Sequence, residues 1–196
     1  MQTLIARVGP CTLRPRRHHF ATLCDSIVSQ QLSIVVAEVI YDRFVTLYPK
    51  RRPTPETVAA TPLRRLKAVG LSGQKASYLK DLAAGFLDGR VQPRRLGRQS
   101  NEEVIAALTS VHGIGRWTAE MFLIFSLNRP DVLPVDDLGI RKAIQRWYGF
   151  KTLPAARTIK RLGEPWHPYE SVASWYLWRS LRLPSASASP MGERRR

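Results

Sequence analysis

Val111-His112-Gly113-Ile114-Gly115-Arg116 is the stretch that decides the fold, because it has the glycine spacing of a short turn between two helices. We expect both glycines to adopt positive φ, which residues bearing a Cβ reach only with strain. The helix that follows opens with unpaired amide N–H groups, and Arg116 and Thr118 can add donors there, which predicts a phosphate site. An ordinary turn between helices with a glycine cap remains the alternative.

The composition is strongly basic. The 196 residues include 31 Lys and Arg against 15 Asp and Glu, giving a formal net charge of +16 and a pI near 10.9. The positive electrostatic potential of such a protein favours binding of a polyanion, and that binding should weaken as the salt concentration rises. A ribosomal or merely basic soluble protein would share this charge. Charge alone therefore indicates affinity for nucleic acid and does not indicate which reaction, if any, the protein catalyses.

Several classes of protein are disfavoured. Cys11 and Cys24 are the only cysteines, too few for an iron–sulfur cluster, and the four histidines lack zinc-ligand spacing. The first residues lack a signal-peptide core, and no apolar stretch approaches the length of a membrane span. We therefore expect a cytoplasmic protein, nucleoid-associated if bacterial, with no membrane partner and no iron–sulfur cluster. We also expect a monomer without a cofactor other than the cation considered below.

Helical periodicity recurs along the chain and strand signals are scarce, which predicts an all-α fold. The expected helices cover residues 20–29, 33–47, two short segments capped by Thr54 and Thr61, one capped by Ser72, one capped by Ser100, and residues 116–127, 138–147, 154–162 and 169–181. We expect two helical lobes flanking a DNA-binding cleft, formed by residues 19–130 and by 1–18 plus 131–184. A disordered tail is expected at 185–196.

Three motifs follow one another in the chain. They are Ile27-Val28-Ser29-Gln30-Gln31-Leu32-Ser33, Val111 to Ala119, which contains the glycine turn, and Leu133-Pro134-Val135-Asp136-Asp137-Leu138-Gly139-Ile140. In this order they resemble the helix-hairpin-helix DNA glycosylases, and within them the 3-methyladenine DNA glycosylase II group. The resemblance covers about Phe20 to Arg182 and implies the compact form, without the mixed α/β domain that precedes this region in longer members.

The resemblance implies a reaction on a base flipped out of duplex DNA. Gln31 then occupies the wedge position that fills the gap, where relatives often carry a bulky apolar residue; a plain loop role for Gln30 and Gln31 stays open. The implied DNA contacts are Gln30, Gln31, Gly113, Gly115, Arg116 and Thr118. Backbone carbonyls of Thr109, Val111 and Ile114 are implied to hold a monovalent cation, sodium or potassium.

Asp137 is the implied catalytic residue. A carboxylate at a helix N-terminus stays ionised readily and can face an oxocarbenium-like sugar as the glycosidic bond breaks. A charge pair at ~4 Å with an effective dielectric of ~20 is worth roughly 4 kcal/mol, about a thousandfold in rate. Asp136 should point elsewhere, since consecutive helical residues diverge by about 100°. A simple N-cap is the alternative for Asp137.

Aromatic residues indicate the substrate. Trp117 stands where lyase-competent relatives carry a lysine, so we expect a monofunctional enzyme that uses water. Trp117 and, by resemblance, Trp178 could stack on a cationic alkylated purine, although Trp178 also fits a core position. Trp166 and Trp175 are expected in the core.

The expected function is hydrolysis of the N-glycosidic bond of alkylated purines, such as 3-methyladenine and 7-methylguanine, in double-stranded DNA, as the first step of base-excision repair. A non-catalytic hairpin DNA-binding protein would explain the charge and the glycines. A glycosylase for hypoxanthine, ethenoadenine or uracil would keep the fold.

Overall fold

The computed structural model describes residues 1–16 and 18–183. The chain divides into two compact units, which we name the hairpin unit, Leu13–Val132, and the terminal unit, Met1–Thr12 with Leu133–Arg196. Throughout the described ranges every regular element is a helix, so the all-α prediction is confirmed. The tail expected at 185–196 lies outside the described residues.

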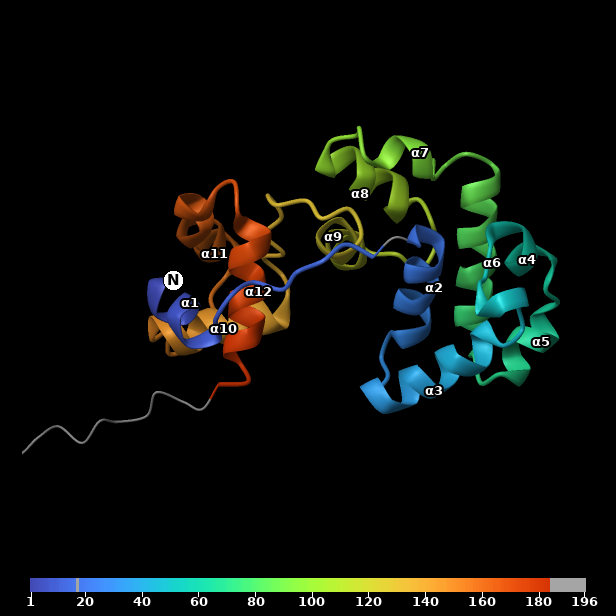
Figure 1. Ribbon diagram of the computed structural model, residues 1–196, viewed down its shortest axis with the longest axis horizontal. Coiled ribbons are helices and arrows are strands. Elements are labelled where there is room, and N and C mark those ends of the chain that lie inside the picture. Colours follow the sequence, from blue (N-terminus) through green and yellow to red (C-terminus); the bar gives the residue numbers. More distant parts are fainter. Residues whose placement is uncertain (17, 184–196) are drawn as a thin grey trace, which may run out of the picture. The chain divides into compact units, whose positions relative to one another are not determined.

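The hairpin unit is built from consecutive helices (Figure 1). They are α2 (His19–Ser29), α3 (Ile34–Val45), the 3-10 turn η1 (Pro49–Arg51), α4 (Pro55–Ala60), α5 (Leu63–Ala68), α6 (Gly73–Leu87), α7 (Pro93–Leu96), α8 (Asn101–Thr109) and α9 (Arg116–Phe125). Helix α6 packs against α2, α4 and α5, and α8 packs against α9. The long helix α6 is therefore the central support of this unit.

Side-chain caps explain where α3, α4, α6 and α8 begin. Ser72 Oγ accepts from the Lys75 amide at 3.2 Å, and Ser100 and Glu103 form the expected capping box, with Glu103 accepting from the Ser100 amide at 2.7 Å. The cap expected at Thr61 is wrong. Its hydroxyl donates to the Thr57 carbonyl at 2.7 Å and closes α4, and Pro62 is the N-cap of α5.

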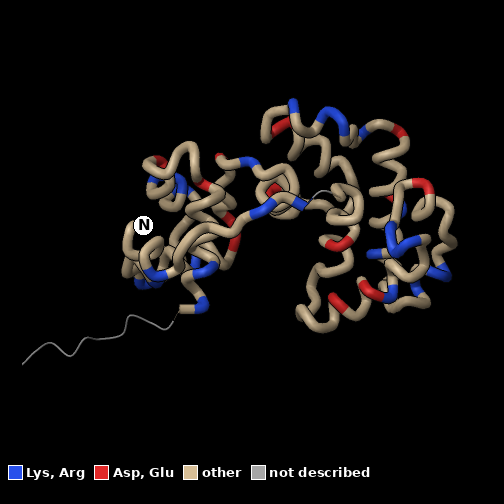
Figure 2. Tube along the Cα trace, in the orientation of Figure 1, with Lys and Arg blue, Asp and Glu red and all other residues tan. Residues whose placement is uncertain are grey.

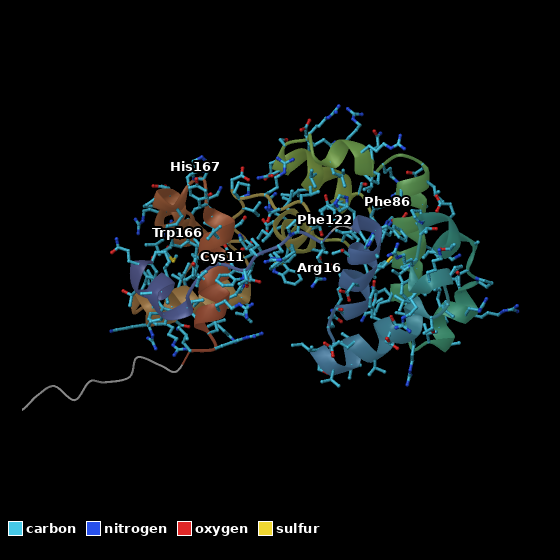
Figure 3. The ribbon with its side chains drawn as sticks, in the orientation of Figure 1. Cys11, Arg16, Phe86, Phe122, Trp166 and His167 are labelled. Atoms are coloured by element: carbon cyan, nitrogen blue, oxygen red, sulfur yellow. The ribbon has the colours of Figure 1, made fainter. Side chains whose placement is uncertain are left out.

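Aromatic contacts join α2 to its neighbours inside the hairpin unit. The rings of Phe20 and Phe86 meet edge to face at 5.1 Å, and those of His19 and Phe122 at 5.3 Å. Phe86 and Phe122 are labelled in Figure 3 and come from α6 and α9. These contacts fix α2, whose end carries the glutamine motif, against both helices.

The terminal unit contains α1 (Gln2–Val8), α10 (Leu138–Tyr148), α11 (Ala156–Gly163), the 3-10 turn η2 (Glu164–Trp166) and α12 (Glu170–Ser180). Helix α12 packs against α1 and α10. Helix α1 was not expected from the sequence. Its Leu4 is buried in a cluster with Ile140 and Leu177, and the Tyr176 hydroxyl donates to the Gly9 carbonyl at 3.0 Å. Leu4 thus anchors α1 in this unit's core.

Two further sequence expectations concern cysteines and membranes. Cys11 and Cys24 are both free thiols, and burial raises the pKa of Cys24 well above its ordinary value, which makes that thiol inert. Within residues 1–16 and 18–183, no helix combines the length and the apolar character that crossing a bilayer requires.

Candidate active site and nucleic-acid interface

Asp137 lies at the N-cap of α10. Its Oδ1 accepts hydrogen bonds from the Ile140 amide at 2.7 Å and from the Trp178 indole Nε1 at 2.8 Å. The residue is 8% exposed, so little of the carboxylate meets solvent. Two N–H donors and the positive end of a helix therefore surround a carboxylate in a poorly hydrated position, where its charge acts strongly on a nearby cation. The N-cap alternative and the catalytic role are compatible, because the cap orients the carboxylate.

Gly139 makes room for this arrangement. A Cβ built there would lie 2.9 Å from Trp178 Cδ1 and 3.0 Å from Asp137 Oδ1, closer than side chains tolerate. The indole can reach the carboxylate only because residue 139 has no side chain. Trp178 also packs against the core cluster of the terminal unit. It therefore lies at the edge of the core, as one expectation had it, and also contacts Asp137.

The remaining tryptophans lie as follows. Trp175 is buried and Trp166, labelled in Figure 3, packs against the core cluster of the terminal unit, as expected for core residues. Trp117 is 50% exposed in the first turn of α9. Its ring offers an accessible apolar face within the hairpin unit. Asp136 is exposed beside the nearly buried Asp137, so the two neighbouring carboxylates do diverge.

The two hairpin glycines differ from each other. Gly113 has φ +86°, and a Cβ there would lie 2.2 Å from Cδ2 of Tyr78 in α6. Gly115 has φ −90°, serves as the N-cap of α9, and has no atom within 4 Å of a built Cβ. The expectation of positive φ at both positions is therefore wrong for Gly115, because the N-cap conformation is extended backbone that any residue adopts.

An ionic network anchors the hairpin. Asp81 of α6 accepts from the His112 amide at 2.7 Å and contacts the His112 ring at 2.8 Å, while Arg90 pairs with its other oxygen at 2.8 Å. The hydrogen bond from Arg90 lowers the pKa of Asp81 to about 2, and the His112 contacts act in the same direction. His112 is thus held through its backbone, and its side chain remains exposed.

Arg116 and Thr118, the other two expected DNA contacts, lie in the first turn of α9. The Arg116 guanidinium donates to Glu120 at 3.1 Å and to Glu102 at 3.0 Å, so it joins the starts of α8 and α9. Thr118 is 5% exposed, so little of this residue meets solvent. Its role as a phosphate donor stays a prediction.

The glutamine motif lies against the hairpin. The Gln30 side-chain amide donates to the Gly113 carbonyl at 2.7 Å, and Gln31 is exposed with φ +57°. A pocket of about 430 Å³ lies at this contact. Its lining includes Gln30, Gln31, Lys75, Tyr78, Gly113 and Gly115. The structure therefore brings four of the six predicted DNA contacts, the two glutamines and the two glycines, to one surface of the hairpin unit.

Positive charge is spread over both units, as Figure 2 shows for Lys and Arg along the trace. Sequence reasoning missed the residues of α6 that support the hairpin: Lys75, Tyr78 and Asp81. Their sequence carries only a helical pattern, and the tertiary partners that give them a role come from α2 and the hairpin. Gly139 belonged to a recognised motif, but its steric role could not be read there.

The sequence and the fold match known proteins. Residues 24–168 match the HhH-GPD superfamily of base excision DNA repair proteins. The chain is 35% identical over 182 residues to DNA-3-methyladenine glycosylase 1 of Schizosaccharomyces pombe, covering 92% of this chain and 80% of that protein. It is similar in structure to S. pombe 3-methyladenine DNA glycosylase Mag1 in complex with abasic DNA, with a TM-score of 0.83, 34% identity, and coverage of 95% and 93% of the two chains. A DNA-3-methyladenine glycosidase from Bacillus halodurans gives a TM-score of 0.83 at 35% identity, covering 91% of this chain and 82% of that one.

The chain belongs to the HhH-GPD superfamily of base excision DNA repair proteins. The family resemblance drawn from the three motifs is confirmed, including its placement beside the 3-methyladenine group.

Proposed function

We propose that this protein hydrolyses the N-glycosidic bond of alkylated purines, of the 3-methyladenine and 7-methylguanine type, in double-stranded DNA. The observation that carries the proposal is Asp137, a nearly buried carboxylate oriented by two N–H donors at the start of α10. The names of the relatives, DNA-3-methyladenine glycosylases, support the same substrate class.

In the proposed reaction the bond between C1′ and the base nitrogen breaks, and its electron pair leaves with the base. A cationic alkylated purine departs as a neutral molecule, so no general acid is needed for it. The Asp137 carboxylate stabilises the positive charge that develops on the sugar and accepts a proton from the attacking water. The products are the free base and an abasic site.

The chemistry should stop at the abasic site. Trp117 occupies the hairpin position at which lyase-type relatives place an amine, and an indole cannot form a Schiff base. Its exposed ring offers a face for a cationic base, with an attraction of about 0.5–2 kcal/mol. Trp178 contributes its N–H to Asp137 and is a second candidate for the base pocket.

DNA is the proposed partner. The N-cap of α9, Gly115, offers no side-chain acceptor, so the amide groups of this ten-residue helix's first turn can meet a phosphate instead. Gln31 is proposed as the wedge, because an exposed residue held in the left-handed region is a costly conformation that a functional role accounts for. We further propose that the protein acts as a monomer.

The hairpin carbonyls fit a monovalent cation. Among the residues that the structure describes, no N–H group donates to the carbonyls of Thr109 and Ile114, while that of Val111 accepts from the Ile114 amide at 3.1 Å. The carbonyl oxygens of Thr109, the last residue of α8, and of Ile114 in the turn support this proposal, and a sodium or potassium ion bound to them would draw the DNA phosphate to the turn. Thr109, Val111 and Ile114 would hold it.

Chromatography of free bases tests the proposal. Methylated duplex DNA is incubated with the protein, and the supernatant is analysed for 3-methyladenine and 7-methylguanine. We expect release of both by the wild type, alkali-labile abasic sites in the DNA, and no strand nick before alkali treatment. Release of hypoxanthine or uracil from the corresponding duplexes, with no methylated base released, would overturn the substrate assignment.

A further inference from the structure

The last turn of α2 takes its positive partner from another helix. Lys75 of α6 donates through Nζ to the carbonyls of Val28 and Gln30, both at 2.7 Å. Helix α2 has no basic residue of its own in its last turn. A cation at a helix C-terminus satisfies carbonyls that lack intrahelical partners and complements the helix dipole. Lys75 therefore fixes where α2 stops.

Gln30 is held from two sides. Its backbone carbonyl binds Lys75, and its side-chain amide binds the Gly113 carbonyl at 2.7 Å. Gly113 in turn lies against Tyr78, one helical turn after Lys75 in α6. One face of α6 thus supports both the hairpin and the end of α2, and Gln30 joins the two.

Gln31, the next residue, adopts φ +57° with its side chain exposed. This conformation costs a residue with a Cβ about 1–2 kcal/mol, and it persists only where the neighbouring structure imposes it. On one side that structure is Gln30 with its Lys75 and Gly113 contacts. On the other side it is Ser33, whose hydroxyl caps α3.

We propose that Lys75 is a positioning residue for Gln31. By binding the Val28 and Gln30 carbonyls it holds the wedge loop, residues 30–33 between α2 and α3, in a fixed position relative to the hairpin. The proposal deepens the proposed function, because it assumes that Gln31 enters the duplex. In this arrangement the hairpin turn and Gln31 keep a fixed position relative to each other. Without Lys75 the hairpin still binds DNA, but the Gln31 side chain is no longer held in the orientation that enters the duplex.

Lys80 supplies a matched control. It lies in the same helix, is partly buried like Lys75, and donates to a carbonyl at the end of another helix, that of Ala59 in α4. Burial lowers the pKa of both lysines. Lys80→Met therefore removes a comparable contact at a site with no link to the wedge loop.

The test uses the whole protein and a duplex carrying 2-aminopurine next to the lesion position, whose fluorescence rises when the neighbouring lesion base leaves the stack. This readout needs no bond cleavage. We expect Lys75→Met to lower the extrusion signal at saturating protein about tenfold, as for loss of hydrogen bonds from a charged donor. Lys80→Met should match the wild type, both variants should lose similar stability, and Lys75→Arg should restore extrusion to within about twofold. In a Gln31→Ala background, Lys75→Met should cause no further loss.

Equal extrusion by Lys75→Met and Lys80→Met would overturn the proposal, and so would additive losses in the Gln31→Ala background. If Lys75→Met does not fold, Lys75→Gln removes the charge at a similar length and carries the same expectation. The two proposals fail separately. If the wild type extrudes the lesion base but releases no alkylated base, the proposed substrate is wrong. If Lys75→Met leaves extrusion unaffected, the proposed positioning role is wrong.

Discussion

Replacing Gly113 by alanine should damage the hairpin more than any other single methyl addition in it. The backbone there has φ +86°, which costs a residue with a Cβ about 1–2 kcal/mol. The new Cβ would also lie 2.2 Å from Cδ2 and 2.4 Å from Cγ of Tyr78, and displacing a packed ring costs about 1–3 kcal/mol. Reduced freedom of the unfolded chain returns about 0.4–1 kcal/mol. The expected loss of unfolding free energy is about 2–4 kcal/mol.

Gly115→Ala is the matched control two residues away. Its φ of −90° suits any residue, and nothing lies within 4 Å of the added methyl group. A small capping loss is offset by the unfolded-state gain, so the change should stay within about 1 kcal/mol. Urea unfolding of both variants and the wild type, followed by circular dichroism, measures the difference. Equal stabilities for the two variants would refute the argument that Tyr78 and the left-handed backbone dictate glycine at 113 alone.

Three further changes have defined outcomes. Asp81→Asn should lower the free energy of unfolding by about 1–2 kcal/mol at pH 7, because the Arg90 contact lowers the pKa of the Asp81 carboxyl to about 2. The stability difference between wild type and variant should hold down to about pH 5 and shrink as the pH falls from about 4 towards 2. Urea unfolding at each pH measures it. Gly139→Ala should slow base release while leaving DNA binding unchanged, since the added methyl group displaces the indole from Asp137; unchanged release would contradict the steric argument. Trp178→Phe should lower the single-turnover rate about tenfold through loss of the N–H donor, with the aromatic ring kept, and a rate equal to that of the wild type would exclude that contribution.

The features that the sequence predicted are those set by local chemistry. Ser72, Ser100 with Glu103, and Asp137 cap helices through contacts three residues away, so their patterns are visible in the letters. The same holds for Gly113, where a turn between helices demands unusual backbone. These local signals were sufficient to recover the all-α fold and the start of α10.

The features that escaped prediction depend on distant partners. Helix α1 is held by burial of Leu4 among residues far along the chain, which a seven-residue pattern cannot reveal. Thr118 looked like a surface residue, and only the packed hairpin unit shows that it is 5% exposed. The support that α6 gives the hairpin through Tyr78 and Asp81 likewise appears only when the helices are assembled.

The direct test of the central claim is the single-turnover rate of 7-methylguanine release from duplex DNA by Asp137→Asn. Asparagine keeps the cap and the oxygen that accepts from Ile140 and Trp178 but removes the charge, so folding and DNA binding should persist. Loss of roughly 4 kcal/mol of charge stabilisation predicts a rate about a thousandfold lower. The exposed neighbour provides the control, since Asp136→Asn should keep the wild-type rate. If Asp137→Asn stays within about tenfold of the wild type, or if Asp136→Asn loses as much, Asp137 is not the catalytic residue.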